Sequence, residues 1–134
     1  MKPPVPVARH VRNLARSCDM YCHGLGLRWV RSLERDGCDS VLLALESGDC
    51  EFEFMQCRSQ VIAPPTQGLV VLYIASLHEW QFRCRRMSRA GFRPVRPVHP
   101  CSDAEACTYQ DPDGYCTVLQ HGDGSIIAPQ TPAR

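Results

Sequence analysis

The chain has 134 residues, a formal net charge of +1 at pH 7 and 22% charged residues. This length fits one domain or two very small modules that share a core. The balanced charge gives no general attraction to nucleic acid or to an anionic membrane, and no apolar run approaches the roughly 20 residues of a membrane span. Residues 1–6 lack the apolar segment of a signal peptide, so we expect a cytoplasmic protein without a membrane anchor.

The nine cysteines are an odd number in a chain without a secretion signal, and 44% hydrophobic residues can form a core without disulfides. We therefore predict that most of the thiols are free and pack as small apolar groups. A structural zinc site is an alternative interpretation, because Cys18 and Cys22 are one helical turn apart and His23 is adjacent. No paired Cys-x-x-Cys completes a four-ligand set.

The first half of the chain predicts the order β-α-β-β-β. Residues 5–11 alternate with the period of a half-buried strand. Asn13 then offers a helix N-cap, and apolar residues recur at helical spacing until Gly24 and Gly26. Three strands follow, separated by turns that contain glycine: residues 27–33, 40–45 and 51–55.

The second half predicts the same order after a proline-rich connector at residues 58–67. An apolar run at residues 68–75 has the length of a strand, and Ser76 with Glu79 forms a capping box for a helix that ends at Gly91. Three more strands follow, the last two flanking the turn sequence Asp111-Pro112-Asp113-Gly114: residues 92–95, 105–110 and 115–120. Residues 121–134 are predicted to be a loosely held tail.

Two stretches of the first half recur in the second half at one constant offset. Gly-Leu-Arg-Trp-Val at residues 26–30 matches Gly-Phe-Arg-Pro-Val at residues 91–95. Residues 50–54 align with residues 115–119 at the same offset. We therefore predict an α+β protein built from two copies of one βαβββ unit, a module at residues 5–57 and a module at residues 68–120.

Several motifs, in their order along the chain, resemble the vicinal oxygen chelate superfamily. They are Asn-Leu-Ala-Arg-Ser at 13–17, Tyr21, His-Gly-Leu-Gly-Leu at 23–27, Glu-Phe-Glu-Phe at 51–54 and Gln-Asp-Pro-Asp-Gly-Tyr at 110–115. That superfamily includes glyoxalase I, bleomycin-resistance proteins, fosfomycin-resistance transferases and extradiol dioxygenases. The resemblance implies paired βαβββ modules that form a curved eight-stranded cup, commonly in a homodimer, with a divalent metal inside the cup.

In the metal-dependent members, one ligand usually comes from the first strand of each module and one from the last strand. The resemblance places Glu53 at the usual acidic position of the first module. The other three places fall on Pro6, Val70 and Val118. These side chains offer no donor atom, and one carboxylate alone does not hold a divalent ion tightly. A complete metal site of the family is therefore not expected.

His10 offers a displaced alternative. Strand alternation places His10 on the same face as Pro6, so a cup lined by Pro6 is also lined by His10. A displaced metal site would use His10 and Glu53, with Glu51 as a third group. The competing interpretation is that His10 is a hydrogen-bonded structural residue.

The same alternation places Glu51 and Glu53 on one face, opposite Phe52 and Phe54, which we expect to pack against the helices. One interpretation is that the two carboxylates act as general acid and general base. The other is that both are solvated at the mouth of the cup. The predicted ligand pocket is largely apolar with a few polar groups: His10, Glu51, Glu53, Leu72, Ile74, Cys116 and Val118. Cys116 is also a candidate nucleophile, with His10 as its base.

Three functions fit these observations. The first is a homodimer that binds a small organic molecule in an apolar cup, without the full metal set. The second is a divalent-metal-dependent enzyme with displaced ligands, resembling lactoylglutathione lyase or a dioxygenase. The third is an interaction or structural subunit whose cup is filled by its own side chains. Nucleic-acid binding is not expected, because the chain lacks a basic stripe with interleaved aromatic residues.

Overall fold

A computed structural model of the chain describes residues 6–48, 50–59, 69–96 and 105–122. The chain divides into two compact units, residues 1–64 and residues 65–134. We call the described part of the first unit module 1 and the described part of the second unit module 2. Each module is described by itself.

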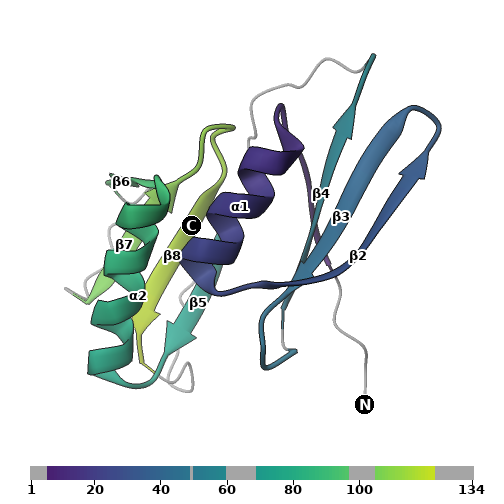
Figure 1. Ribbon diagram of the computed structural model, residues 1–134. Helices are drawn as coiled ribbons and strands as arrows, with labels where there is room; N and C mark the ends of the chain where they lie inside the picture. The colour runs from purple at the N-terminus through teal and green to yellow at the C-terminus, as the bar shows by residue number, and fades with distance from the viewer. Residues whose placement is uncertain (1–5, 49, 60–68, 97–104, 123–134) are drawn as a thin grey trace, which may run out of the picture. The chain divides into compact units, whose positions relative to one another are not determined.

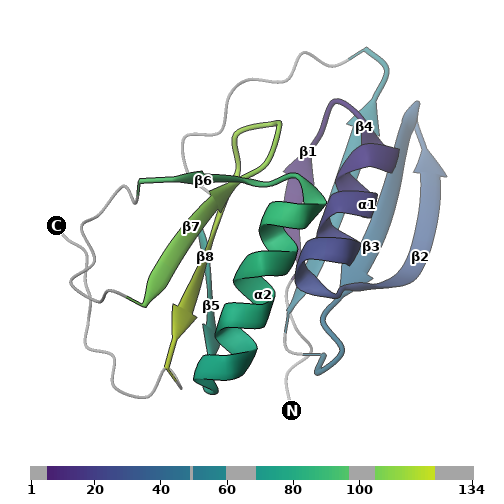
Figure 2. The same ribbon diagram turned by 60° about the vertical axis from the view of Figure 1, so that its left-hand side comes forward.

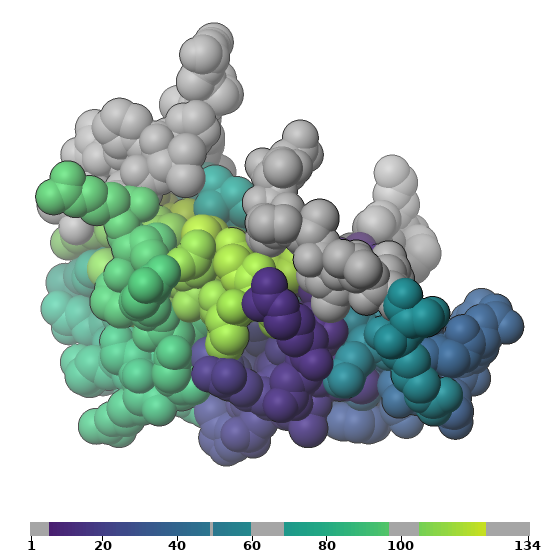
Figure 3. All heavy atoms as spheres, turned by 90° about the horizontal axis from the view of Figure 1, so that it is seen from above, coloured from purple at the N-terminus to yellow at the C-terminus, as the bar shows by residue number. Residues whose placement is uncertain are grey.

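Module 1 consists of a four-stranded sheet and one helix (Figure 1). Its elements are β1 (Val7–His10), α1 (Leu14–Leu25), β2 (Arg28–Arg35), β3 (Cys38–Ala44) and β4 (Glu51–Cys57). The sheet order is β1-β4-β3-β2, with β1 parallel to β4 and the other neighbours antiparallel. Helix α1 covers one face of this sheet (Figure 2). Strand β2 is therefore the edge strand at the far end from β1, and the blue atoms of the β2–β3 hairpin form one side of the module (Figure 3).

Module 2 repeats this arrangement. Its elements are β5 (Val70–Ile74), α2 (Leu77–Ala90), β6 (Arg93–Val95), β7 (Ala106–Gln110) and β8 (Cys116–His121). The sheet order is β5-β8-β7-β6, again with one parallel pair, β5 and β8. The predicted α+β fold with two βαβββ modules is confirmed.

The helix ends follow the capping residues that the sequence predicts. The Asn13 side chain accepts a hydrogen bond from the Arg16 amide at 3.0 Å, and Ser76 Oγ accepts one from the Glu79 amide at 3.1 Å. Each oxygen satisfies an amide of the first turn that has no partner within the helix. Gly26 and Gly91 end the helices with φ of 69° and 104°, a left-handed conformation that glycine adopts without a Cβ clash.

The turn before β8 is built around a buried aspartate, as its sequence predicts. Asp111 Oδ1 accepts hydrogen bonds from the Asp113 and Tyr115 amides, both at 2.9 Å. Asp111 is 5% exposed, so these bonds replace the water that the carboxylate loses on burial. The turn thereby fixes the β7–β8 register.

The core of module 1 is aromatic and encloses an arginine. Phe52, Phe54 and Tyr21 are fully buried, with ring centroids between Tyr21 and the two phenylalanines 5.4 and 4.7 Å apart. The guanidinium of Arg9, which is 1% exposed, donates to the Tyr21 hydroxyl at 2.7 Å and lies 5.3 Å from the Phe52 ring centroid. Hydrogen bonding and the aromatic faces compensate part of the cost of burying this charge.

The core of module 2 is smaller and more polar. Met87 is the one residue of α2 that is fully buried among those described, and Leu119 and Thr117 of β8 are also fully buried. The Trp80 indole donates to the Leu119 carbonyl at 2.9 Å, and the Tyr109 hydroxyl donates to the Cys84 carbonyl at 3.3 Å. The helix and the sheet are therefore joined by one side chain from each, Trp80 of α2 and Tyr109 of β7.

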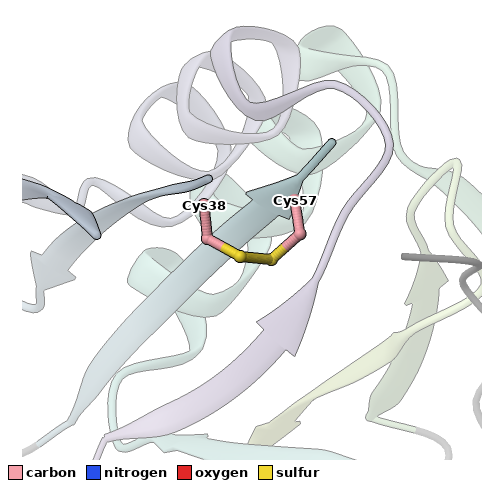
Figure 4. Close-up of a disulfide and its surroundings, with 2 residues drawn as sticks. All are labelled: Cys38 and Cys57. Atoms are coloured by element: carbon pink, nitrogen blue, oxygen red, sulfur yellow. A yellow bond between two sulfur atoms is a disulfide. The ribbon is translucent and has the colours of Figure 1, made fainter. Parts of the chain in front are cut away.

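Two details differ from the sequence-based expectations. Cys38 and Cys57, directly opposite each other on β3 and β4, form a disulfide (Figure 4). The expectation of mostly free thiols holds for six other described cysteines and is wrong for this pair. Strand β8 also includes His121, which the sequence pattern assigns to the tail. Its ring bonds the Glu105 carboxylate and the Ala75 carbonyl; residues 123–134 lie outside the described residues.

Candidate functional site

The face of the module 1 sheet opposite α1, which we call open face 1, carries the polar residues of the predicted site. Phe52 and Phe54 point to the helix side, so alternation places Glu51, Glu53 and Met55 on open face 1. The register pairs Ala8 with Glu53 and His10 with Met55 on the adjacent strand. His10, Glu51 and Glu53 therefore share one face of two neighbouring strands.

Glu53 has apolar neighbours on both sides. It stands opposite Ala8 on β1 and opposite Leu42 on β3, and Leu42 is 7% exposed. Glu51 and His10, like Glu53, are half-buried. A carboxylate among apolar groups accepts hydrogen bonds from a ligand with less competition from water than it would meet on an open surface. The arrangement is suited to fixing a hydroxyl or amine of a small molecule.

The face of the module 2 sheet opposite α2 is called open face 2. The residues on this face differ from those that the sequence analysis placed in the ligand pocket. The register pairs Val71 with Val118 and Leu72 with Leu119. Leu119 is fully buried on the helix side, so Leu72 and Ile74 also point toward α2. Leu72 and Ile74, which the sequence assigned to the ligand pocket, therefore lie on the helix side of the sheet, whereas Cys116 and Val118 lie on open face 2.

The β5–β8 register also corrects the metal-ligand place that the sequence analysis put at Val70. Val70 pairs with Thr117, which is fully buried, so Val70 also faces the helix side. The residues of β5 on open face 2 are Val71 and Tyr73, which are 39% and 48% exposed. Sequence reasoning missed both of them.

A signal in the sequence could have identified these two residues of β5. The helix caps Asn13 and Ser76 are 63 residues apart (76 − 13). Glu51 and Cys116, the first residues of β4 and β8, are 65 residues apart (116 − 51), so the offset between the two modules is smaller at the helix caps. With the smaller offset, His10 corresponds to Tyr73 and Pro6 corresponds to Leu69. Leu69 is 45% exposed and, like Val70, offers no donor atom to a metal.

Comparisons with known proteins agree with this architecture. Residues 67–121 match the model of the YycE-like C-terminal domain. The uncharacterised protein YycE of Bacillus subtilis is 25% identical over 123 residues, which cover 90% of this chain and 88% of YycE. The crystal structure of Bacillus subtilis YycE, a protein of unknown function grouped provisionally with glyoxalase and fosfomycin-resistance proteins, superposes with a TM-score of 0.75 at 24% identity, covering 88% of each chain.

A second structural neighbour extends the comparison. The glyoxylase/bleomycin-resistance/dioxygenase domain from Frankia sp. EAN1pec has a TM-score of 0.73 at 16% identity, covering 92% of this chain and 99% of that domain. These neighbours show that the chain has the fold of the vicinal oxygen chelate superfamily. The fosfomycin-resistance protein FosX of Listeria monocytogenes has the same fold, with a TM-score of 0.68 at 10% identity over 92% of this chain and 93% of that one. That FosX structure is a mutant in complex with Mn(II) and a dihydroxypropylphosphonic acid.

The donor set of this chain does not fit a divalent ion held in the way that is usual for the superfamily. At the four ligand places, Glu53 supplies one carboxylate, and Pro6, Leu69 or Val70, and Val118 supply none. Within the described ranges, no group of three or more His, Cys, Asp or Glu side chains is placed to hold a metal ion. Divalent cations need several oxygen or nitrogen donors. The alternative zinc site at Cys18, Cys22 and His23 is not such a group either.

The thiols of the helices are poor nucleophiles. Burial raises the pKa of Cys18 and of Cys84 to about 11, and it raises the pKa of Cys22. Because the thiolate is the reactive form, these side chains are almost entirely unreactive thiols near neutral pH. Cys116 lies in module 2 and His10 lies in module 1, so their pairing as nucleophile and base stays a prediction.

In the part of the chain that the structure describes, neither helix is long and apolar enough to cross a membrane.

Proposed function

We propose that this protein binds a small organic molecule on its open faces and does so without the four-ligand metal site of its superfamily. The observation that supports this most strongly is the position of Glu53 on open face 1. Its carboxylate lies between Ala8 and Leu42 on the same face as His10 and Glu51. A few polar groups among apolar ones are typical of small-molecule sites.

The polar residues of open face 1 define the chemistry of the ligand. Glu51 and Glu53 accept hydrogen bonds when ionised, and His10 can donate or accept. A ligand with hydroxyl or amine donors therefore matches this group on β1 and β4 better than a ligand that carries only carboxylates. The arginines of open face 1 lie on the edge strand β2, which β3 separates from β4. Open face 2 exposes Val71 and Tyr73 beside Val118 and offers apolar and aromatic contacts instead.

A thermal-shift screen tests this proposal. A panel of aromatic, thiol-containing and antibiotic compounds is added to the full chain, because any ligand of the native state must raise the melting temperature. The affinity of each ligand found is then measured by calorimetry in the presence of a chelator. We expect binding to survive the chelator and to weaken about tenfold or more in Glu53→Gln, since a lost charged hydrogen bond costs about 1.5–3 kcal/mol.

Glu34→Gln is the matched control. Glu34 lies on β2, opposite Asp39, and pairs weakly with Arg58 at 3.9 Å on the surface. This variant removes one carboxylate from the same module without touching open face 1, so ligand affinity should not change. Equal losses in Glu34→Gln and Glu53→Gln would contradict the assignment of open face 1, and a screen without any ligand would favour a structural subunit.

The second candidate is a divalent-metal-dependent lyase or dioxygenase with displaced ligands. It draws support from His10 and Glu53, which lie on adjacent strands of one face, and from the Mn(II) that the related FosX binds. This candidate requires metal at one ion per chain and its loss in both His10→Ala and Glu53→Ala. The homodimer also stays a prediction, which sedimentation of the purified chain tests.

A further inference from the structure

Strand β2 presents an unusual surface. All eight of its residues are exposed, whereas its neighbour β3 contains four buried ones. Trp29 is 57% exposed, and Val30 and Leu33 are each 43% exposed. Trp29 and Leu33 stand on opposite faces of the strand, because they pair with Leu43 and Ser40, which are an odd number of residues apart. Because a strand of this kind exposes large apolar side chains on both faces, a partner that covers β2 would bury apolar surface.

The backbone of β2 has one free side. Among the described residues of module 1, β2 is hydrogen-bonded to β3 alone. An edge strand of this length offers a row of amide and carbonyl groups to an incoming strand. The other edge strand of the same type, β6 in module 2, has only three residues.

The positive charge of β2 favours an acidic protein partner. Arg28, Arg31 and Arg35 pair with Ala44, Leu42 and Cys38, so all three lie on open face 1 beside Leu33. None of the three forms an ion pair within the described ranges, while the one acidic residue of the strand, Glu34, pairs with Arg58. Arginine and tryptophan are the residue types most enriched at protein–protein hot spots.

We propose that β2 is a docking edge for an extended acidic segment of a protein partner, which adds to the module 1 sheet as a further strand. The partner's main chain pairs with the free edge, and its acidic side chains lie opposite Arg28, Arg31 and Arg35. A second copy of this chain is the less favoured occupant. Three arginines and one glutamate give β2 a net charge of +2 (3 − 1), and two such strands side by side repel each other.

Arginines on an edge can also serve only to prevent self-association. That role accounts for the charges but not for the exposed Trp29, which a purely protective edge does not need. The bulge between Trp29 and Arg31 brings Arg28 and Arg31 to adjacent positions on open face 1. A matching segment read antiparallel to β2 therefore has the alternating pattern Glu-x-Leu-x-Glu-x-Glu.

Fluorescence anisotropy with labelled peptides tests the docking edge. The probe is a peptide of that pattern, with one residue opposite each residue of β2 except the bulged Val30. The comparison peptide has lysine in place of each glutamate. We expect the full chain to bind the acidic probe, and to bind it more weakly as salt is added. Arg31→Glu and Trp29→Ala should each weaken binding about tenfold or more.

Arg85→Glu is the matched control, because Arg85 is an exposed arginine on α2 in the other module. Its affinity for the probe should equal that of the unchanged chain, and circular dichroism confirms that all three variants are folded. Absence of probe binding, equal binding of the lysine peptide, or equal binding of single-stranded DNA would overturn the proposal. A dimer whose dissociation constant rises in Arg31→Glu would overturn it in favour of a second copy.

Discussion

The two modules have the same strand order and the same helix caps but different side chains on their open faces. Open face 1 carries His10, Glu51 and Glu53, whereas the corresponding places in module 2 hold Tyr73, Cys116 and Val118. One backbone plan thus supports a titratable polar face in module 1 and an apolar face in module 2. Function in such a repeat is decided by the side chains at a few equivalent positions and not by the fold.

The cores differ as well. Helix α1 has six buried residues, among them Tyr21, which contacts Phe52 and Phe54, whereas only Met87 of α2 is buried. At the place in the repeat that corresponds to Phe52, module 2 has the buried Thr117. Its hydroxyl has no hydrogen-bond partner among the described residues. Helix α1 of module 1 therefore contributes more buried residues than α2, and module 2 contains a buried hydroxyl whose missing hydrogen bond reduces its stability.

The largest expected effect comes from changing this pair of core residues. Phe52→Ala should lower the free energy of unfolding by about 3–5 kcal/mol, because it leaves a large cavity in module 1. Thr117→Val has nearly the same shape and removes the unsatisfied hydroxyl, so it should be neutral or stabilising by about 1 kcal/mol. Urea denaturation measures both changes. A comparable loss in the two variants would show that the cores do not differ in this way.

Removal of the disulfide should have the next largest effect, in module 1 alone. Cys38 and Cys57 are 19 residues apart, and a cross-link that closes a loop of this length stabilises by about 3 kcal/mol through the entropy of the unfolded chain. Cys57→Ser should therefore increase hydrogen exchange in β3 and β4 and leave β7 and β8 unchanged. Increased exchange in module 2 as well would mean that the modules unfold as one unit.

Alkaline pH should destabilise module 2 more than module 1. Burial raises the pKa of Cys18 and of Cys84 to about 11 from the ordinary value of 9.0, and burial and a hydrogen bond with Cys84 raise the pKa of Tyr109. A raised pKa means that the folded state holds its proton longer than the unfolded state. For the two thiols the resulting stabilisation is complete below pH 9 and is lost as the pH rises toward 11, whereas for Tyr109 the loss begins only above the ordinary pKa of 10.0.

Thermal unfolding between pH 8 and pH 11 measures this dependence. Each module has two groups with a raised pKa, Cys18 and Cys22 in module 1 and Cys84 and Tyr109 in module 2. Because the hydrogen bond with Cys84 also raises the pKa of Tyr109, Cys84→Ala should flatten the decline of the melting temperature more than Cys18→Ala does. Equal slopes in the two variants and the unchanged chain would show that neither thiol contributes.

The parts of the fold that the sequence could predict depend on local chemistry. Asn13, Ser76, Gly26 and Gly91 set helix ends through contacts within one turn, and the spacing of Phe52 and Phe54 with the glutamates between them reveals which face of β4 is buried. These signals need no knowledge of distant residues.

The errors concern features that depend on strand register. Residues 69–74 are apolar without exception, so no polar residue shows which face of β5 is buried, and Leu72 and Ile74 were assignable only from the pairing with β8. The Cys38–Cys57 disulfide likewise follows from the β3–β4 register, which places the two residues opposite each other. Cysteine spacing alone does not give pairings.

The metal content of the purified chain tests the central claim most directly. Protein prepared without chelator is analysed for bound metals, and its melting temperature is measured with and without added Mn²⁺. Because the ligand places hold one carboxylate and apolar side chains, we predict far less than one ion per chain and no stabilisation by Mn²⁺. One tightly bound ion per chain that is lost in both His10→Ala and Glu53→Ala would contradict the account.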